Sequence, residues 1–337
     1  MRSLRIGMLG PIAWRTPPLA YGPWELVTSQ LTEGLVARGV DVTLFATLDS
    51  LTAATLAGVA PHGYASDPAM DGRVWEALHI AHAMARSAEF DLVHSHQDWL
   101  PLALVEQWRA PLLTTVHGFS GAGILPAYAR ARSHYVSISD ADRSPELSYV
   151  ATIHHGIDMS ELPFSATASG GLVVLGRIHP DKGTHVAIDI ARRADRVLTL
   201  CGLIQDQQYF VEQVEPFIDG ERVCYLGNVG SSQRAQVLGQ ASALLHPISF
   251  AEPFGLAVVE AFACGTPVVA FAKGSMPEVV DEGVTGYLAT DVDSALVALE
   301  LAVRLDRAGV RQQAVARFSV DRMVEDYLRV YEHLLEG

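Results

Sequence analysis

Short apolar runs alternate with amphipathic helical patterns along the whole chain. Residues Leu4–Leu9, Pro111–Val116 and Leu172–Leu175 have the length and composition of buried strands. Residues Pro23–Arg38 and Thr184–Arg193 carry apolar side chains at helical spacing. This alternation is typical of βαβ units, so the sequence predicts an α/β protein with parallel sheets.

The clearest of these units lies around residue 250. The apolar run Ala243–Ile248 predicts a strand, and the helix that begins after Gly255 is expected to end at Gly265, in the left-handed position. The start of this helix should lie at the carboxyl edge of the sheet, where free N–H groups and the helix dipole favour a phosphate. Glu252 and Glu260 would repel that anion, so we expect them to bind neutral hydroxyl groups instead.

Two cations follow the strand at Leu172–Leu175. Arg177 and Lys182 are predicted to leave the same edge of the sheet. The chain has only two lysines against 22 arginines, so a lysine at this place favours a specific role. Arginine can bind phosphate oxygens bidentately and lysine acts as a point charge, so the pair suits a diphosphate. The alternative is that both are solvated loop residues.

These segments resemble the retaining nucleotide-sugar glycosyltransferases of family 4. The shared motifs are Gly176-Arg177 with Lys182-Gly183, the two glutamates eight residues apart, Cys264-Gly-Thr-Pro, and the Pro277-Glu278 segment. The resemblance covers nearly the whole chain. It implies the GT-B fold, in which two Rossmann-like domains with parallel sheets face each other across a cleft. It also implies that no metal or other cofactor is needed beside the nucleoside diphosphate sugar, which is a co-substrate.

The resemblance implies a role for each matching residue. Arg177 and Lys182 would hold the donor diphosphate. Glu260 would bind the ribose hydroxyls, and Glu252 the transferred sugar. Further donor contacts are implied for the backbone of Phe254, Gly255 and Leu256 beside the sugar, and for Asn228 and Val229 near the base.

The N-terminal half carries a related loop. Tyr21-Gly22-Pro23-Trp24-Glu25 is similar to a family loop that commonly reads Tyr-Gly-Gly-x-Glu and approaches the donor phosphate and the acceptor. Pro23 replaces the second glycine and has no N–H to donate, so Gly22 becomes the better candidate for a phosphate contact.

Three histidines stand at or near predicted strand ends. The resemblance places His117, in the segment His117–Gly121, beside the transferred sugar, whereas its residue type and position alone indicate a structural role. His94 and His96 alternate along one strand in the manner of metal ligands. Two residues are an incomplete ligand set, so a structural interpretation is favoured for both.

The length of 337 residues suits two domains. We expect an N-terminal, acceptor-side domain over 1–155 and a nucleotide-sugar-binding domain over 156–316. By the resemblance, 317–337 form a helix that crosses back to the first domain. His155, in the place of the family's usual asparagine, marks the expected hinge.

The composition and the absence of targeting patterns make several partners and locations less favoured. The formal charge of −14 disfavours nucleic acid and anionic membranes. Three cysteines without a CxxC pattern indicate reduced core residues. No stretch reads as a secretory signal or a transmembrane segment, so a soluble, cytoplasmic protein is expected. The alanine-rich, arginine-over-lysine composition is similar to that of actinomycete proteins, and the compact length would suit an antibiotic-pathway enzyme.

Together with the motifs, the resemblance predicts a retaining, metal-independent hexosyltransferase. Its donor would be a nucleoside diphosphate sugar, with UDP favoured and GDP possible, and its acceptor a hydroxyl group of a small molecule or glycan. A sugar-nucleotide epimerase or hydrolase on the same fold is the main alternative, and a catalytically dead nucleotide-binding protein is another. A metal-dependent transferase would need an acidic pair at a strand end, whereas Asp291 and Asp293 fit a helix start. An NAD-dependent oxidoreductase would need Gly-x-Gly-x-x-Gly, which the segment Gly7–Gly10 lacks.

Overall fold

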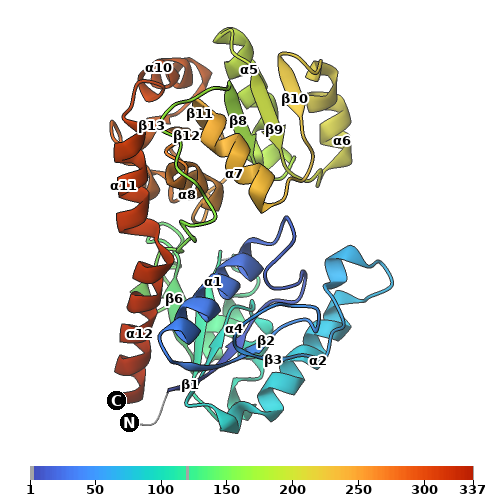
Figure 1. Ribbon diagram of the computed structural model, residues 1–337. Coiled ribbons are helices and arrows are strands. Elements are labelled where there is room, and N and C mark those ends of the chain that lie inside the picture. The colour runs from blue at the N-terminus through green and yellow to red at the C-terminus, as the bar shows by residue number, and fades with distance from the viewer. Residues whose placement is uncertain (1–3, 119–120, 337) are drawn as a thin grey trace. The chain divides into compact units, whose positions relative to one another are not determined.

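The computed structural model describes residues 4–118 and 121–336. Phe119 and Ser120, which belong to the segment His117–Gly121, lie outside the described residues. The chain divides into two compact units, which are described one by one (Figure 1). The first unit combines Met1–Gly156 with Val320–Gly337, and the second is Ile157–Ser319.

The described residues of the first unit form a seven-stranded, all-parallel sheet in the order β3-β2-β1-β4-β5-β6-β7. Its strands are β1 Arg5–Leu9, β2 Asp41–Phe45, β3 Thr55–Ala57, β4 Leu92–Ser95, β5 Leu112–Val116, β6 His134–Ser137 and β7 Tyr149–Thr152. Its helices are α1 Pro23–Ala37, α2 Gly72–Ala85, α3 Leu100–Ala103, α4 Leu125–Arg130 and α12 Val320–Glu336.

The second unit, described throughout, has a six-stranded parallel sheet in the order β10-β9-β8-β11-β12-β13. Its strands are β8 Leu172–Leu175, β9 Leu198–Cys201, β10 Val223–Tyr225, β11 Ala243–His246, β12 Val268–Phe271 and β13 Gly286–Ala289. Its helices are α5 Thr184–Arg193, α6 Gln207–Tyr209, α7 Ser231–Gln240, α8 Leu256–Ala263, α9 Met276–Val279, α10 Val292–Ala302 and α11 Arg307–Phe318.

Both sheets are doubly wound, which means that the strand order reverses once. The reversal lies between β1 and β4 in the first sheet and between β8 and β11 in the second. Sheets of this type bind ligands in the crevice outside the carboxyl ends of the strands at the reversal. A ligand site of the second unit is therefore expected at the loops that follow β8 and β11.

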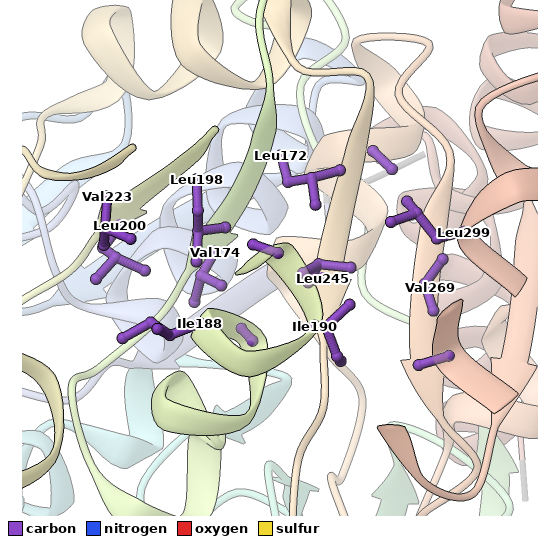
Figure 2. Packing of buried hydrophobic residues seen from close by; sticks show 14 of the residues in the cluster. Leu172, Val174, Ile188, Ile190, Leu198, Leu200, Val223, Leu245, Val269 and Leu299 are labelled. Atoms are coloured by element: carbon purple, nitrogen blue, oxygen red, sulfur yellow. The ribbon is translucent and has the colours of Figure 1, made fainter. Parts of the chain in front are cut away.

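The core of the second unit follows from the alternation of its strands. Leu172 and Val174 of β8 lie with Leu198 and Leu200 of β9 on one face, where α5 packs its Ile188 against them (Figure 2). Successive strand side chains point to opposite faces, so every second residue meets the helix layer. The predicted α/β class with parallel sheets is confirmed.

Most predicted element bounds are close to those in the structure. The predicted strand at Leu172–Leu175 and the predicted helix at Thr184–Arg193 have the bounds of β8 and α5. Gly265 follows α8 with φ of +79°, the left-handed conformation expected at a helix stop. Asp291 is the N-cap of α10 and accepts from the backbone N–H of Ser294, so the acidic pair there begins a helix.

The last helix of the chain, α12, belongs to the first unit and packs on α1. Met323, Val324, Tyr327 and Tyr331 are fully buried on its inner face. The contact is close because Gly34 of α1 has no side chain. A Cβ atom at residue 34 would lie 2.5 Å from Cγ2 of Val324, well inside van der Waals contact.

We predict that Gly34→Ala destabilises the first unit by about 1–3 kcal/mol, because overpacking against a stiff β-branched side chain outweighs the better helix propensity of alanine. Val324→Ala should recover part of that loss in the double variant. Urea unfolding of the two single variants and the double variant measures the coupling. Val297→Ala, at a position that is 65% exposed, is the matched control. Strictly additive effects of Gly34→Ala and Val324→Ala would contradict the close contact.

Candidate active site

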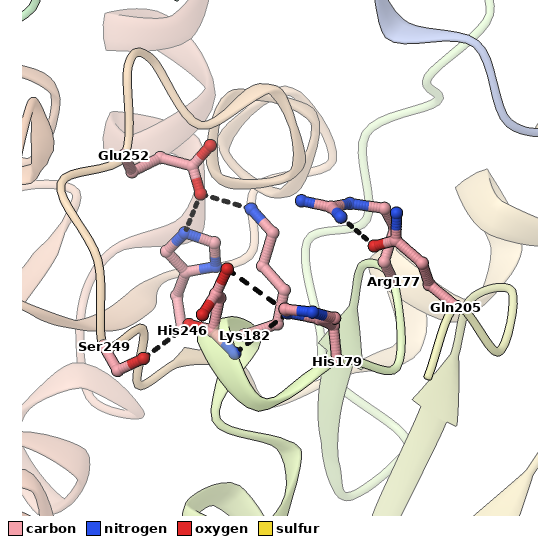
Figure 3. Close-up of polar contacts among 8 residues, drawn as sticks. Arg177, His179, Lys182, Gln205, His246, Ser249 and Glu252 are labelled. Atoms are coloured by element: carbon pink, nitrogen blue, oxygen red, sulfur yellow. Dashed lines mark hydrogen bonds and ion pairs between the residues drawn. The ribbon is translucent and has the colours of Figure 1, made fainter. Parts of the chain in front are cut away.

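Three side chains predicted to act on the donor meet at the strand reversal of the second sheet. Arg177 follows β8, and Lys182 ends the 3₁₀ turn Pro180–Lys182 that comes next. Glu252 lies on the loop after β11, the strand beside β8. The side chains of Arg177 and Lys182 extend toward the same region, and the carboxylate of Glu252 lies at the end of Lys182 (Figure 3).

Lys182 and Glu252 form a largely buried ion pair. Nζ of Lys182 contacts Oε2 of Glu252, with 15% and 12% of the two side chains exposed. Nζ also lies 4.7 Å from the ring centroid of Phe250, at cation–π distance. Nε2 of His246, at the end of β11, lies 3.4 Å from the same oxygen of Glu252. Oε2 is therefore occupied by protein groups, whereas Oε1 points away from both partners (Figure 3).

The charge of Glu252 depends on these two partners. Burial alone would raise the pKa of Glu252, but the neighbouring imidazole of His246 and the charge of Lys182 outweigh burial and lower the pKa to about 2. Burial also lowers the pKa of His246, in spite of the neighbouring carboxylate. At neutral pH the group is thus a carboxylate beside an ammonium and a neutral imidazole, and Oε1 is left to accept from a ligand hydroxyl.

Backbone contacts fix the two loops relative to each other. The N–H of Ser249 donates to the carbonyl of Asp181 at 2.8 Å, which ties the loop after β11 to the turn that carries Lys182. On the other side, the N–H of Ser275 donates to the carbonyl of Glu252 at 2.8 Å. Gly274 makes this approach possible, because a Cβ there would lie 2.3 Å from the backbone N and O of Glu252. The position of Glu252 is therefore set by residues on both sides of it in the sequence.

Arg177 is held by a neighbouring loop. Its guanidinium donates to the side-chain oxygen of Gln205, which follows β9 (Figure 3). A guanidinium has five N–H donors, so this contact leaves others for a ligand. Gln205 and His246 are site residues that the sequence analysis missed. His246 at the end of a buried strand carried a signal, since it resembles His117 in that position, but nothing marked Gln205.

The predicted helix start is also present. Gly255 is the N-cap of α8 in the left-handed conformation, and Leu256 is its first residue. Phe254 is 2% exposed and packs edge-on against Phe318. Further along α8, Oε1 of Glu260 lies 3.3 Å from a guanidinium nitrogen of Arg234 on α7, a third residue missed by the sequence analysis.

The two residues predicted to lie near the base precede α7. Asn228 is exposed, and Val229 is buried. They follow β10 by a few residues, at the same edge of the sheet as Arg177 and Glu252. The structure thus places all the predicted donor-binding residues of the second unit on loops or helix starts at one edge, or on α8.

Gly22 and His117 belong to the first unit. Gly22 is the N-cap of α1 with Pro23 as the first helical residue, as predicted. Glu25, in the first turn, accepts from the N–H of Trp14 at 3.1 Å, which fastens the loop after β1. Burial raises the pKa of Glu25 to about 7, although backbone hydrogen bonds oppose the shift.

His117 is enclosed by other side chains. Its Nε2 lies 2.8 Å from Nδ1 of His96, and its Nδ1 lies 3.3 Å from Nε2 of His155. The indole of Trp24 stacks on the ring with centroids 5.2 Å apart. Both ring nitrogens of His117 are therefore engaged within the first unit.

His94 is likewise engaged at both nitrogens. Nδ1 pairs with the hydroxyl of Tyr331 at 2.7 Å and Nε2 with that of Thr115 at 2.8 Å. These contacts link β4 to β5 and to α12 within the first unit, as expected for a structural histidine.

Among residues 4–118 and 121–336, no group of three or more His, Cys, Asp or Glu side chains is arranged to hold a metal ion. None of the helices in those ranges is long and apolar enough to cross a membrane.

The buried histidines make the first unit sensitive to acid. Burial lowers the pKa of His79 to about 4 and those of His94 and His117 to about 3, and the pKa values of His96 and His155 fall well below the ordinary value. Each group binds its proton more weakly in the folded chain than in the unfolded chain. Its contribution to stability is therefore complete above about pH 6.5 and is lost as the pH falls below that value.

We predict that the first unit loses several kcal/mol of stability per pH unit below about pH 6.5, since each neutral histidine contributes about 1.4 kcal/mol per unit. Among the histidines of the second unit, all of which the structure describes, only His246 is buried. All five tryptophans lie in the first unit, so their fluorescence follows that unit alone during an acid titration. His155→Asn should make the transition less steep. Fluorescence that stays native to about pH 4 would refute the prediction.

Comparison with solved structures identifies the fold of the protein. AviGT4, a glycosyltransferase involved in avilamycin A biosynthesis, superposes with a TM-score of 0.77 at 23% identity over 99% of this chain and 98% of its own. Alr3699/HepE of Anabaena, in complex with UDP and glucose, superposes with a TM-score of 0.75 at 20% identity over 98% and 100%. Together with the two doubly wound sheets, these likenesses confirm the predicted GT-B fold.

Two family models match the chain. The model of glycosyl transferases group 1 matches residues 168–312, and that of glycosyltransferase family 4 matches residues 25–206, more than half of the chain. The chain belongs to glycosyltransferase family 4. A glycogen synthase of Mycobacterium tuberculosis is similar over 94% of this chain and 90% of its own length, at 28% identity.

Proposed function

We propose that the chain is a retaining glycosyltransferase that moves a hexose-like unit from a nucleoside diphosphate sugar to an acceptor hydroxyl without a metal ion. UDP is the favoured nucleotide, and GDP is the alternative. One observation carries the proposal. Arg177 and Lys182 lie with Glu252 at the strand reversal of the second sheet, next to the start of α8, so that cations suited to a diphosphate adjoin an acceptor for a sugar hydroxyl.

The reaction needs stabilisation of the leaving group. The bond between the anomeric carbon and the diphosphate oxygen breaks, and negative charge builds on the diphosphate. Arg177, Lys182 and the N–H groups at the start of α8 are oriented to receive that charge. The acceptor oxygen forms its bond to the anomeric carbon on the same face, and its proton passes to the departing phosphate. Neither Glu252 nor Glu260 acts as a nucleophile in this scheme, because Glu260 is assigned to the ribose.

The other residues complete the donor site. Oε1 of Glu252 would accept from a hydroxyl of the transferred sugar, beside the backbone of Phe254, Gly255 and Leu256. Asn228 and Val229 would lie near the base. In the first unit, the acceptor side of the enzyme in this proposal, Gly22 would contact the phosphate. His117 would lie beside the sugar, with its backbone as the contacting part because its ring nitrogens are engaged.

The comparisons favour this proposal over its rivals. A neighbour of the same fold is described in complex with UDP and glucose, and a relative that is similar over 94% of the chain is a glycogen synthase. The name of AviGT4 supports an antibiotic-pathway acceptor, which we propose together with a cytoplasmic location. An epimerase or hydrolase would use similar donor contacts, and the products formed from UDP-glucose with and without acceptors would separate it from a transferase.

We predict that transfer from the donor persists after exhaustive chelation, because the charge on the diphosphate is met by Arg177 and Lys182 rather than by a metal. The measurement is product formation from UDP-glucose or GDP-mannose with a panel of hydroxyl acceptors, in the presence and absence of EDTA. The anomeric configuration of the product, determined by NMR, tests retention in the same samples. Loss of activity in EDTA that Mg²⁺ or Mn²⁺ restores would contradict the prediction.

We also predict that Arg177→Ala and Lys182→Ala each lower kcat, on the order of 10²–10³-fold, because they remove charge stabilisation that grows toward the transition state. The double variant should lose less than the product of the single effects, since both cations serve one diphosphate. Arg177→Lys should recover only part of the loss, because it lacks the bidentate fork. Steady-state kinetics at saturating donor measures the effects after circular dichroism has established folding.

Arg304→Ala is the matched control for these variants, because Arg304 is an exposed arginine of the same unit with 74% of its side chain accessible. Near-wild-type kcat in both single variants would show that the cations are solvated loop residues and that the leaving-group scheme is wrong.

A further inference from the structure

Glu260 occupies an unusual position for a carboxylate. It lies on the inner face of α8, and only 7% of its side chain is exposed. A buried carboxylate is stable only if other groups compensate for its charge. The residue that faces it is Arg234 in the first turns of α7, whose side chain is 16% exposed.

The contact between these residues is one-sided. A terminal guanidinium nitrogen of Arg234 lies 3.3 Å from Oε1 of Glu260. In the part of the chain that the structure describes, Oε2 of Glu260 has no hydrogen-bond donor, and Nε of Arg234 is buried without a hydrogen-bond partner. Glu260 therefore has one oxygen in contact with Arg234 and one oxygen available to a ligand, as Glu252 has with Lys182.

The surroundings of Glu260 leave this arginine as the main compensating charge. Burial raises the pKa of Glu260, Arg234 opposes that shift, and the carboxylate of Glu161 in the segment before β8 adds to it. The thiol of Cys264 lies one turn further along α8, and the nearby Glu260 is one reason why its pKa is raised to about 12, after burial itself. The thiol is thus neutral and brings no charge to the site.

We propose that Arg234 is a positioning residue of the donor site, which holds Oε1 of Glu260 so that Oε2 is charged and turned to accept the ribose hydroxyls of the nucleotide. The inference rests on the proposed function, because it gives Glu260 the ribose contact. Arg234 itself need not touch the donor. It also lies on the helix that follows Asn228 and Val229, so base and ribose contacts would depend on the same short stretch of chain.

The test is the affinity for UDP and for GDP, measured by titration calorimetry between about pH 8 and about pH 6. The wild-type chain is expected to bind one of the two nucleotides, with an affinity that varies little with pH at the upper end of that range. Arg234→Gln should weaken this affinity roughly tenfold. The loss should grow as the pH falls, because Glu260 without its cation takes up a proton more readily and a protonated carboxyl group accepts less strongly from hydroxyls. Arg234→Lys keeps the charge and should recover much of the affinity and most of the pH profile.

Two further variants separate positioning from other roles. In a Glu260→Gln background, Arg234→Gln should have little additional effect, because Arg234 acts through Glu260. Arg304→Gln removes an exposed arginine of the same unit and should leave affinity and pH profile unchanged. The carboxyl ¹³C signal of Glu260, assigned by its loss in Glu260→Gln, should titrate at higher pH in Arg234→Gln than in the wild-type chain.

The outcomes can be told apart. If the wild-type chain binds neither nucleotide, the proposed function fails and this inference fails with it. If the wild-type chain binds and Arg234→Gln binds equally well at all pH values, the inference alone is wrong. An equal loss in both backgrounds, independent of pH, would mean that Arg234 contacts the donor directly, which also overturns the positioning role.

Discussion

The ion pair between Lys182 and Glu252 is the interaction on which the candidate site depends. It joins the loop after β8 to the loop after β11, at the only reversal of strand order within the second sheet as described. Separating a buried pair costs several kcal/mol when one partner is left charged. The pair therefore fixes a cation and a carboxylate at one spot before any ligand arrives, and a diphosphate sugar would find both charges already oriented.

Glu260 is paired with a protein cation in the same way as Glu252. Each of the two glutamates has one oxygen against a protein cation, and the other oxygen has no donor among the residues that the structure describes. A carboxylate has lone pairs on both oxygens, so a cation on one side leaves hydrogen-bonding capacity on the other. Burial strengthens both contacts, because the low dielectric that makes an unpaired charge costly also makes a paired one rigid. This explains how acidic side chains can stand beside an anion site without repelling the anion.

Much of this could be predicted from the sequence, and the reasons are local. β8 and α5 were predictable because an apolar run and a helical repeat are bounded by glycine and by a change of period. Lys182 was conspicuous because lysine is rare in this chain. Arg177, Lys182 and Glu252 could be brought together because parallel strands deliver their loops to one edge, and the family resemblance assigned each a role.

The partners of these residues could not be predicted in the same way. His246 lies against Glu252 because the intervening loop is bent back by its contact with Gly274 and Ser275, far along the chain. Arg234 meets Glu260 only through the packing of α7 on α8. His96, His117 and His155 come from three separate strand ends, and no spacing in the sequence marks their contact. Side chains that act through tertiary packing leave no periodic signal.

The place of α12 has a consequence for biosynthesis. The first unit contains the N-terminal 156 residues but fills its core with Met323, Tyr327 and Tyr331 from the last helix. A ribosome delivers the N-terminal segment first, and domains usually fold in that order. Here the second unit is contiguous in sequence and can fold while the first unit still lacks α12, which completes its core. The order of folding is thus expected to be reversed, with the N-terminal unit completed only after the final helix has emerged.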